Sequence, residues 1–207
     1  MTAYNLTAAI STAWLTTAAV DGDAFRQALG RLAAGVSVIT TSDATGQKFG
    51  LTATAVSSVS VDPPLILVCL GAWTRAMAPL SAHAPFIVHL LAAEQRSLAE
   101  HFATPHADKF ADVEHGTDQG GCPRLADALA WIECVPQQLI PAGDHTIVIG
   151  QVVALKSHSD RAPLIYSHSK HRYHRRRRGR SPARPLPSPA RYDRDDLLVR
   201  AHLAPGH

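Results

Sequence analysis

The fold is decided by residues 48–70, which read KFGLTATAVSSVSVDPPLILVCL. The first part predicts a strand rich in small hydroxylated residues, the Pro63-Pro64 pair ends it, and an almost wholly apolar strand follows. A flat ligand with a hydrogen-bonding edge would suit such a hydroxylated surface. The alternative is the solvated face of an antiparallel sheet, where Ser and Thr are also common. Five hydroxyl side chains fall within nine residues: Thr52, Thr54, Ser57, Ser58 and Ser60.

The composition predicts one folded domain with terminal extensions. A chain of 207 residues, 46% hydrophobic and 18% charged, can bury a sizeable core and is not disordered as a whole. From Ser167 onward, one lysine and ten arginines outweigh three aspartates, so this part carries +8 and the rest −5 of the formal net charge of +3. We therefore expect an N-terminal arm at 1–22, a domain at 23–173 and a basic tail at 174–207.

The tail at 174–207 is rich in Arg and Pro, and we expect it to be disordered. Its arginine run at 175–180 has no interleaved aromatic side chain on which bases could stack, so nucleic acid is not the expected partner. An acidic partner surface, a neutral extension and a GC-rich gene read out of frame remain as alternatives.

Cysteine usage and hydropathy predict a cytoplasmic protein. The three cysteines are far apart and form no C-x-x-C pair, which argues against a disulfide framework and a cysteine-rich zinc site. No run of about twenty apolar residues predicts a membrane span. The first twenty residues lack the basic start of a signal peptide.

Hydrophobic and β-branched patterns predict the elements of the domain. Asp23 is expected to cap a first helix that ends at Gly35, and residues 103–124 read as a long polar loop. Many short strands without βαβ alternation favour a mainly β fold with a closed antiparallel sheet and flanking helices. Further helices are expected through 77–80 and at 94–102, and strands at 36–41, 85–91, 128–135, 146–154 and 163–166.

Several common site motifs are absent from the sequence. Neither the G-x-G-x-x-G nor the G-x-x-x-x-G-K-[ST] nucleotide loop occurs, and no G-x-S-x-G elbow is present. His101 and His106 have no carboxylate or cysteine placed to complete a metal site, so no metal is expected.

Three separated blocks of the chain resemble one known family. They are residues 25–41, residues 50–65 and the segment at 143–146, which reads GDHT. In this order they closely resemble the flavin reductase family, the short-chain split-barrel reductases that serve two-component flavin monooxygenases, over roughly Asp23 to Tyr173. The resemblance implies a homodimeric antiparallel split β-barrel of the FMN-binding type. It also implies an oxidoreductase that uses NADH or NADPH to reduce FMN or FAD for a partner monooxygenase.

The resemblance assigns the flavin to the hydroxylated strand. The backbone and hydroxyls of Thr52, Ala53 and Thr54 would meet the hydrogen-bonding edge of the ring. Ser57 and Ser58 lie further along, where they would face the ribityl chain or the phosphate.

A phosphate seat is expected after the apolar strand. Thr74 and Arg75 combine a cation with free N–H groups at the start of a helix. Leu70, at the end of the apolar strand, is included among the flavin contacts. The segment at 71–73, which reads GAW, departs from the family, where more polar residues are frequent at this place.

The nicotinamide side of the site is assigned to His145. In the family the Gly-Asp-His segment faces the nicotinamide, so His145 would position that ring. Asp144 would hold the His145 ring and fix its tautomer. The alternative is a hydrogen-bonded loop histidine without a ligand. Lys109-Phe110 matches a basic-aromatic pair of the family and is expected to close over the flavin phosphate or ring. Hydride transfer between the two cofactors requires orientation and no general base.

Two other functions fit the same sequence. One is a flavin-binding split barrel of the pyridoxamine phosphate oxidase-like type, and the other is a non-catalytic flavin- or heme-binding module. Consumption of reduced nicotinamide in the presence of flavin separates both from a reductase.

Overall fold

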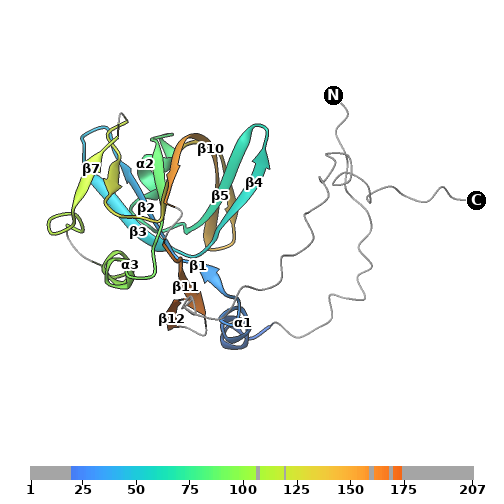
Figure 1. Cartoon of the computed structure of the whole chain (residues 1–207). Coiled ribbons are helices and arrows are strands. Elements are labelled where there is room, and N and C mark those ends of the chain that lie inside the picture. The colour runs from blue at the N-terminus through green and yellow to red at the C-terminus, as the bar shows by residue number, and fades with distance from the viewer. Residues whose placement is uncertain (1–19, 106–107, 119, 159–160, 168–169, 174–207) are drawn as a thin grey trace, which may run out of the picture. The chain divides into compact units, whose positions relative to one another are not determined.

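The computed structural model describes residues 20–105, 108–118, 120–158, 161–167 and 170–173. The expected arm, except for its last three residues, and the expected tail lie outside this part of the chain, as does His106. The described part is mainly β, and its largest element is an antiparallel sheet of seven strands in the order β3-β2-β6-β9-β10-β5-β4 (Figure 1). The expected mainly β, antiparallel fold is confirmed.

The elements have the following bounds. The seven strands are β2 (Ser37–Ser42), β3 (Lys48–Ala53), β4 (Val56–Val61), β5 (Pro64–Gly71), β6 (Phe86–Leu90), β9 (Ala130–Ala142) and β10 (His145–Ser157). Two smaller sheets hold β1 (Ala34–Gly35), β11 (Leu164–Ser167) and β12 (Lys170–Tyr173), and β7 (His115–Thr117) and β8 (Pro123–Leu125). The helices are α1 (Gly22–Leu29), α2 (Met77–Ser81) and α3 (Arg96–Ala103).

The segment 48–70 forms both edges of the large sheet. The prediction of a single hydroxylated strand is wrong, because β3 ends at Ala53 and a second strand, β4, begins at Val56. These two strands are opposite edges of the sheet, and only Thr54 and Ala55 join them. A link of this length spans roughly 11 Å, so the sheet must curve until its edges are neighbours. The edges are joined by this short link, and a 2.9 Å hydrogen bond from the Cys69 amide of β5 to the Ala55 carbonyl extends the β4–β5 pairing into it.

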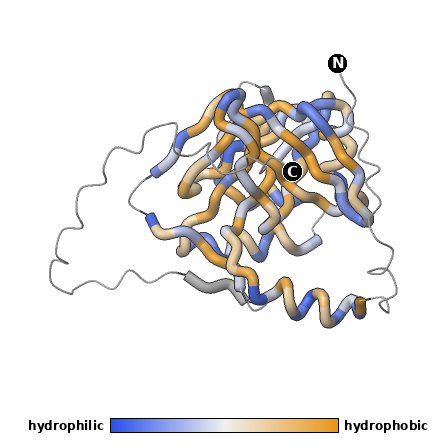
Figure 2. Tube along the Cα trace, turned by 90° about the vertical axis from the view of Figure 1, so that its right-hand side faces the viewer, coloured by the Kyte–Doolittle hydropathy of each residue, from blue (hydrophilic) through white to orange (hydrophobic). Residues whose placement is uncertain are grey.

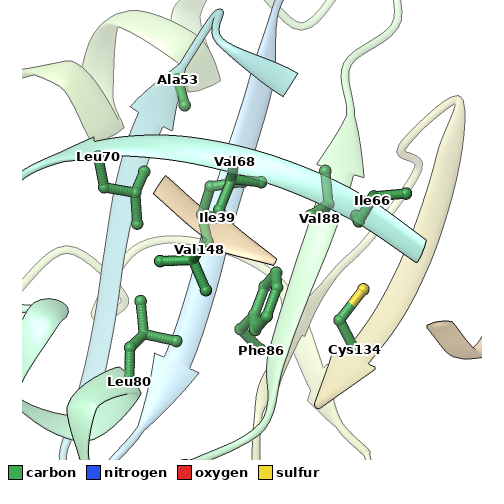
Figure 3. Packing of buried hydrophobic residues seen from close by; sticks show 10 residues of the cluster. All are labelled: Ile39, Ala53, Ile66, Val68, Leu70, Leu80, Phe86, Val88, Cys134 and Val148. Carbon is green, nitrogen blue, oxygen red and sulfur yellow. The ribbon is translucent and has the colours of Figure 1, made fainter. Parts of the chain in front are cut away.

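The concave side of this curved sheet is filled by an apolar core. Ile39, Val68, Phe86 and Val148 are fully buried and converge with Leu80 of α2, as Figure 3 shows. Buried and partly exposed residues alternate along most of β5. Figure 2 shows apolar and polar stretches interleaved over the described part of the chain. This core fixes the strands whose outer ends carry the site.

A second core lies beneath α3. Phe102 and Ala99 of this helix are fully buried and pack with Val38 of β2 and with Val36, which lies just before that strand. The helix is also held to β3, because the Thr52 hydroxyl donates a 2.6 Å hydrogen bond to the Ala99 carbonyl. These contacts place the C-terminal end of α3 beside the outer surface of β3.

Two local predictions differ from the structure. Asp21, not Asp23, caps α1, because its carboxylate accepts a 2.9 Å hydrogen bond from the Ala24 amide. The helix ends at Leu29 with Gly30 as its C-cap, whereas Gly35 lies in β1. The segment at 103–124 is more than a loop, because it contains β7 and begins β8.

Candidate functional site

A cavity of about 700 Å³ opens between β3, the β5–α2 connection and the end of α3. This volume is in the range of about 300–1,000 Å³ that ligand pockets take. The described residues that line it include three cations, four aromatic rings and no carboxylate. They are Lys48, Phe49, Gly50, Leu51, Thr52, Trp73, Thr74, Arg75, Ala76, Phe102, Ala103, Pro105, Lys109 and Phe110.

Among the described residues, the positive charges of the cavity have no carboxylate within ion-pair distance. The Arg75 guanidinium lies 5.6 Å from the centroid of the Phe49 ring. The Lys109 ammonium donates a 2.7 Å hydrogen bond to the Phe102 carbonyl at the end of α3. Burial, and then the charge of Arg75, lower the pKa of Lys109. An anion between Arg75 and Lys109 would relieve this repulsion.

The aromatic wall is formed by two buried rings. Phe102 and Phe110 meet edge to face with their centroids 5.3 Å apart. Gly50 of β3 makes room for Phe102, because a Cβ at this position would lie 2.4 Å from the Phe102 ring. The glycine therefore allows the Phe102 ring to pack directly against the backbone of β3.

Thr74 provides a polar group at the opposite wall. Its hydroxyl is buried and has no hydrogen-bond partner among the described residues. Its amide donates a 3.0 Å hydrogen bond to the Gly71 carbonyl, so the free N–H group expected at Thr74 is wrong. The helix α2 begins only at Met77 and has five residues. What the site offers here is the hydroxyl of Thr74 and the charge of Arg75.

His145 approaches the cavity through Trp73. In the ladder between β10 and β5, His145 lies opposite Gly71, and the Ala72 amide donates a 3.1 Å hydrogen bond to the Asp144 carbonyl. The Trp73 ring folds back over Gly71 and meets the His145 ring edge to face, with centroids 5.6 Å apart. The histidine turn is thereby attached to the wall of the cavity.

Asp144 orients the His145 ring. Its carboxylate lies 2.6 Å from His145 Nδ1, and this hydrogen bond lowers the pKa of Asp144. Because Nδ1 donates its hydrogen bond to the Asp144 carboxylate, the other ring nitrogen, Nε2, is left for a ligand. The contact agrees with the role expected of Asp144.

The structure gathers some of the predicted site residues and separates others. The cavity is lined by Thr52, Thr74, Arg75, Lys109 and Phe110. The hydroxyl of Thr52 is already bonded to α3, so only its backbone and methyl group remain for a ligand. Outside the lining are Ala53 and Leu70, which are buried, and Thr54, Ser57 and Ser58, which are exposed.

Sequence reasoning missed several residues of the lining. Lys48, Phe49 and Gly50 precede the predicted hydroxylated run. Trp73 belongs to the segment at 71–73 that departs from the pattern of the family, and it was not predicted to line the site. The Lys48-Phe49 pair repeats the basic-aromatic pattern of residues 109–110, and this was the available signal.

Metal, thiol and membrane features are limited in the described part of the chain. It contains no group of three or more His, Cys, Asp and Glu side chains able to hold a metal ion. His101 Nε2 instead lies 2.8 Å from the Lys109 carbonyl.

Burial raises the pKa of the Cys122 and Cys134 thiols to about 12, so neither is a thiolate at neutral pH. No described helix has the length and apolar character needed to cross a membrane.

Comparison with known proteins decides the family. Residues 29–175 match the family model described as flavin reductase like domain. The chain belongs to the flavin reductase family. This agrees with the resemblance seen in the sequence and with the mainly β architecture.

Three relatives in the flavin reductase family illustrate the match. A probable flavin reductase of Rhizobium meliloti is 41% identical over 143 residues, which are 69% of this chain and 46% of the relative, so the chain spans about half of that protein. The reductase component of a Rhodococcus opacus 4-nitrophenol monooxygenase is 38% identical over 147 residues, 71% of this chain and 78% of the relative. The structure of a Streptomyces globisporus NADH:FAD oxidoreductase with NAD and FAD fragments superposes with a TM-score of 0.70 and 32% identity, covering 75% of this chain and 96% of that one.

Proposed function

We propose that this chain is an NAD(P)H-dependent flavin reductase. The observation that carries the proposal is the lining of the cavity, which combines cations and aromatic rings without a carboxylate. A flavin nucleotide is an aromatic anion, so its ring and its phosphate find matching surfaces there. Family membership and the names of the relatives support the same activity.

The residues of the cavity fit the flavin in three ways. Arg75 and Lys109 would hold its phosphate, and the hydroxyl of Thr74, buried without a partner, would gain one by a small rotation. The rings of Phe102 and Phe110 would support the apolar body of the ligand. The other predicted contacts do not line this cavity, so a flavin held there would touch them only where it reaches beyond the lining; they are Ala53, Thr54, Ser57, Ser58 and Leu70.

His145 would position the nicotinamide. Its ring is oriented by Asp144 and lies against Trp73 at the edge of the cavity. With both cofactors held in this way, the chemistry they would supply is hydride transfer from carbon 4 of the nicotinamide to nitrogen 5 of the flavin. The contribution of the chain is to orient the rings and limit their motion, which requires no general base.

The wider assignment also concerns partners and location. We propose that the reduced flavin is delivered to a monooxygenase, as the name of the Rhodococcus opacus relative suggests for that protein. A homodimer is supported by exposed apolar side chains on α1 and β10, namely Phe25, Leu29, Val153 and Leu155. Light scattering of the purified chain would measure its mass in solution. The free cysteines support a cytoplasmic location.

The activity is tested by mixing the purified protein with flavin and reduced nicotinamide. Absorbance of the nicotinamide is followed with NADH and then with NADPH, each with FMN and with FAD. Consumption far above the rate without protein supports a reductase. If flavin binds but neither nucleotide is consumed above that rate, the chain is a flavin-binding module and the proposal is wrong.

A further inference from the structure

A second hollow adjoins the cavity. Its volume is about 450 Å³, again within the range of ligand pockets. Lys48 and Phe110 line both spaces, so the two hollows meet at the beginning of β3. The rest of its lining is Gly46, Gln47, Asp108, Ala111 and His115.

Lys48 is held at this junction by a histidine. Its ammonium lies 2.8 Å from His115 Nε2, and His115 Nδ1 lies 2.7 Å from the Val113 carbonyl. Because a carbonyl only accepts, Nδ1 must carry the proton, which leaves Nε2 as the acceptor for Lys48. The His115 ring is fixed in turn by edge-to-face contact with Phe110, at 5.3 Å between centroids.

The positive charge at the junction belongs to Lys48. Among the described residues, Lys48 has no carboxylate within ion-pair distance, although Asp108 lines the same hollow. Arg75 and Lys109 form a separate cationic pair inside the first cavity. The combined space therefore offers two seats for anions, one inside the cavity and one at its junction with the second hollow.

We propose that the two hollows form one extended site for a flavin dinucleotide. The flavin mononucleotide half would occupy the first cavity, the adenylate half would occupy the second hollow, and Lys48 would bind the second phosphate. FMN has one phosphate and would leave both Lys48 and the second hollow unused. The chain therefore selects FAD over FMN. This inference rests on the proposed flavin site and adds the class of flavin to it.

The first test compares the two flavins in the absence of nicotinamide. Quenching of flavin fluorescence gives the Kd for FAD and for FMN with the wild-type protein, Lys48→Met and the control Lys156→Met, an exposed lysine of β10. We expect FAD to bind about tenfold more tightly than FMN. Lys48→Met should weaken FAD about five- to tenfold, and FMN much less, because it removes one charge-assisted contact. Lys156→Met should leave the ratio as in the wild type.

A second set of variants tests the role of His115. His115→Leu removes the acceptor for Lys48 and should weaken FAD about threefold relative to FMN, whereas His115→Gln keeps an acceptor and should restore much of the difference. In the Lys48→Met background, His115→Leu should have no further effect on the ratio. A purely structural role would weaken both flavins equally in both backgrounds.

Several outcomes would overturn the inference. Equal wild-type affinities for FMN and FAD, or an equal loss of both in Lys48→Met, would show that Lys48 does not bind a second phosphate. A loss of NAD⁺ affinity in Lys48→Met with unchanged FAD affinity would assign the hollow to the nicotinamide dinucleotide. In both cases consumption of NADH with FMN would still establish the reductase, whereas failure to bind either flavin would refute both proposals.

Discussion

The rings of Trp73 and His145 meet edge to face, with centroids 5.6 Å apart and planes inclined at 74°. Trp73 also lines the cavity, and it lies over Gly71, where a Cβ would be 2.9 Å from the indole. His145 faces the same glycine across the ladder of β5 and β10. One indole ring thus connects the histidine turn with the proposed flavin cavity, although the two are about 70 residues apart in sequence.

Replacing His145 should act mainly on the nicotinamide. We expect His145→Ala to raise the KM for NADH about tenfold, because a hydrogen bond and an oriented ring are lost, while the Kd for flavin changes little. The control is His158→Ala, because His158 is an exposed histidine just beyond β10. Steady-state kinetics and flavin titration of the two variants provide the measurements. An unchanged KM would remove His145 from the site.

Replacing Arg75 should act on the phosphate of the flavin. Arg75→Gln should weaken FMN about tenfold and riboflavin much less, because riboflavin lacks the phosphate. Wild-type affinity for FMN should also fall with rising salt, and this dependence should be smaller in the variant. Arg96→Gln, which changes an exposed arginine of α3, is the control. Equal losses for FMN and riboflavin would place the phosphate elsewhere.

Gly50 should tolerate no side chain. The Cβ of Gly50→Ala would lie 2.4 Å from the Phe102 ring, which is fully buried and cannot retreat into the core. We expect the free energy of unfolding to fall by about 1–3 kcal/mol. The displaced ring should also narrow the cavity and weaken flavin binding. Gly35→Ala meets nothing within 4 Å and is the matched control. Urea unfolding and flavin titration measure both effects, and equal behaviour of the two variants would contradict the packing.

His89 should make the fold sensitive to mild acid. The ring is fully buried, and its Nδ1 lies 3.1 Å from the Val38 carbonyl, while Nε2 accepts a hydrogen bond from the Leu125 amide at 3.1 Å. Protonation would place an N–H group against that amide. Burial is the main cause that lowers the pKa of His89 from 6.5 to about 4, and the charge of Arg124 adds to it.

The direction of this pH effect follows from the lowered pKa. Between pH 6.5 and pH 4 the unfolded chain binds a proton that the folded chain does not, so stability falls as the pH falls through this window. From pH 8 to pH 5 the residue should cost about 2 kcal/mol of the free energy of unfolding. Urea unfolding should show this slope in the wild type and in the control His83→Asn, an exposed site. The slope should be smaller by that amount in His89→Asn, and an unchanged slope would contradict the argument.

The sequence predicted the strands of the sheet better than their arrangement. Alternation and β-branching identify Ser37–Ser42 and Pro64–Gly71 because these signals are local. The break between β3 and β4 was not predicted because the link, Thr54 and Ala55, contains neither Gly nor Pro. No local sequence pattern indicates that these two consecutive strands lie at opposite edges of the sheet. That arrangement is set by long-range pairing across the whole sheet.

Residues of the candidate site were predicted only where they belong to a recognisable sequence motif. Arg75, Lys109 and His145 were named from the resemblance, and the structure places the first two in one cavity and the third against its wall. The role of Trp73 depends on the room left by Gly71, which is a contact in space and has no sequence pattern. Lys48 was missed for a similar reason, since its partner His115 comes from a distant hairpin.

The central claim is that the cavity and the histidine turn together hold flavin and nicotinamide for hydride transfer. It is tested most directly by mixing the FAD-saturated protein with NADH without oxygen and following the loss of flavin absorbance, with NADH and with its 4-deuterated form. We predict a loss that saturates with NADH, runs far faster than for free flavin and slows with deuterium. A rate equal to that of free flavin, with flavin bound, would contradict the account.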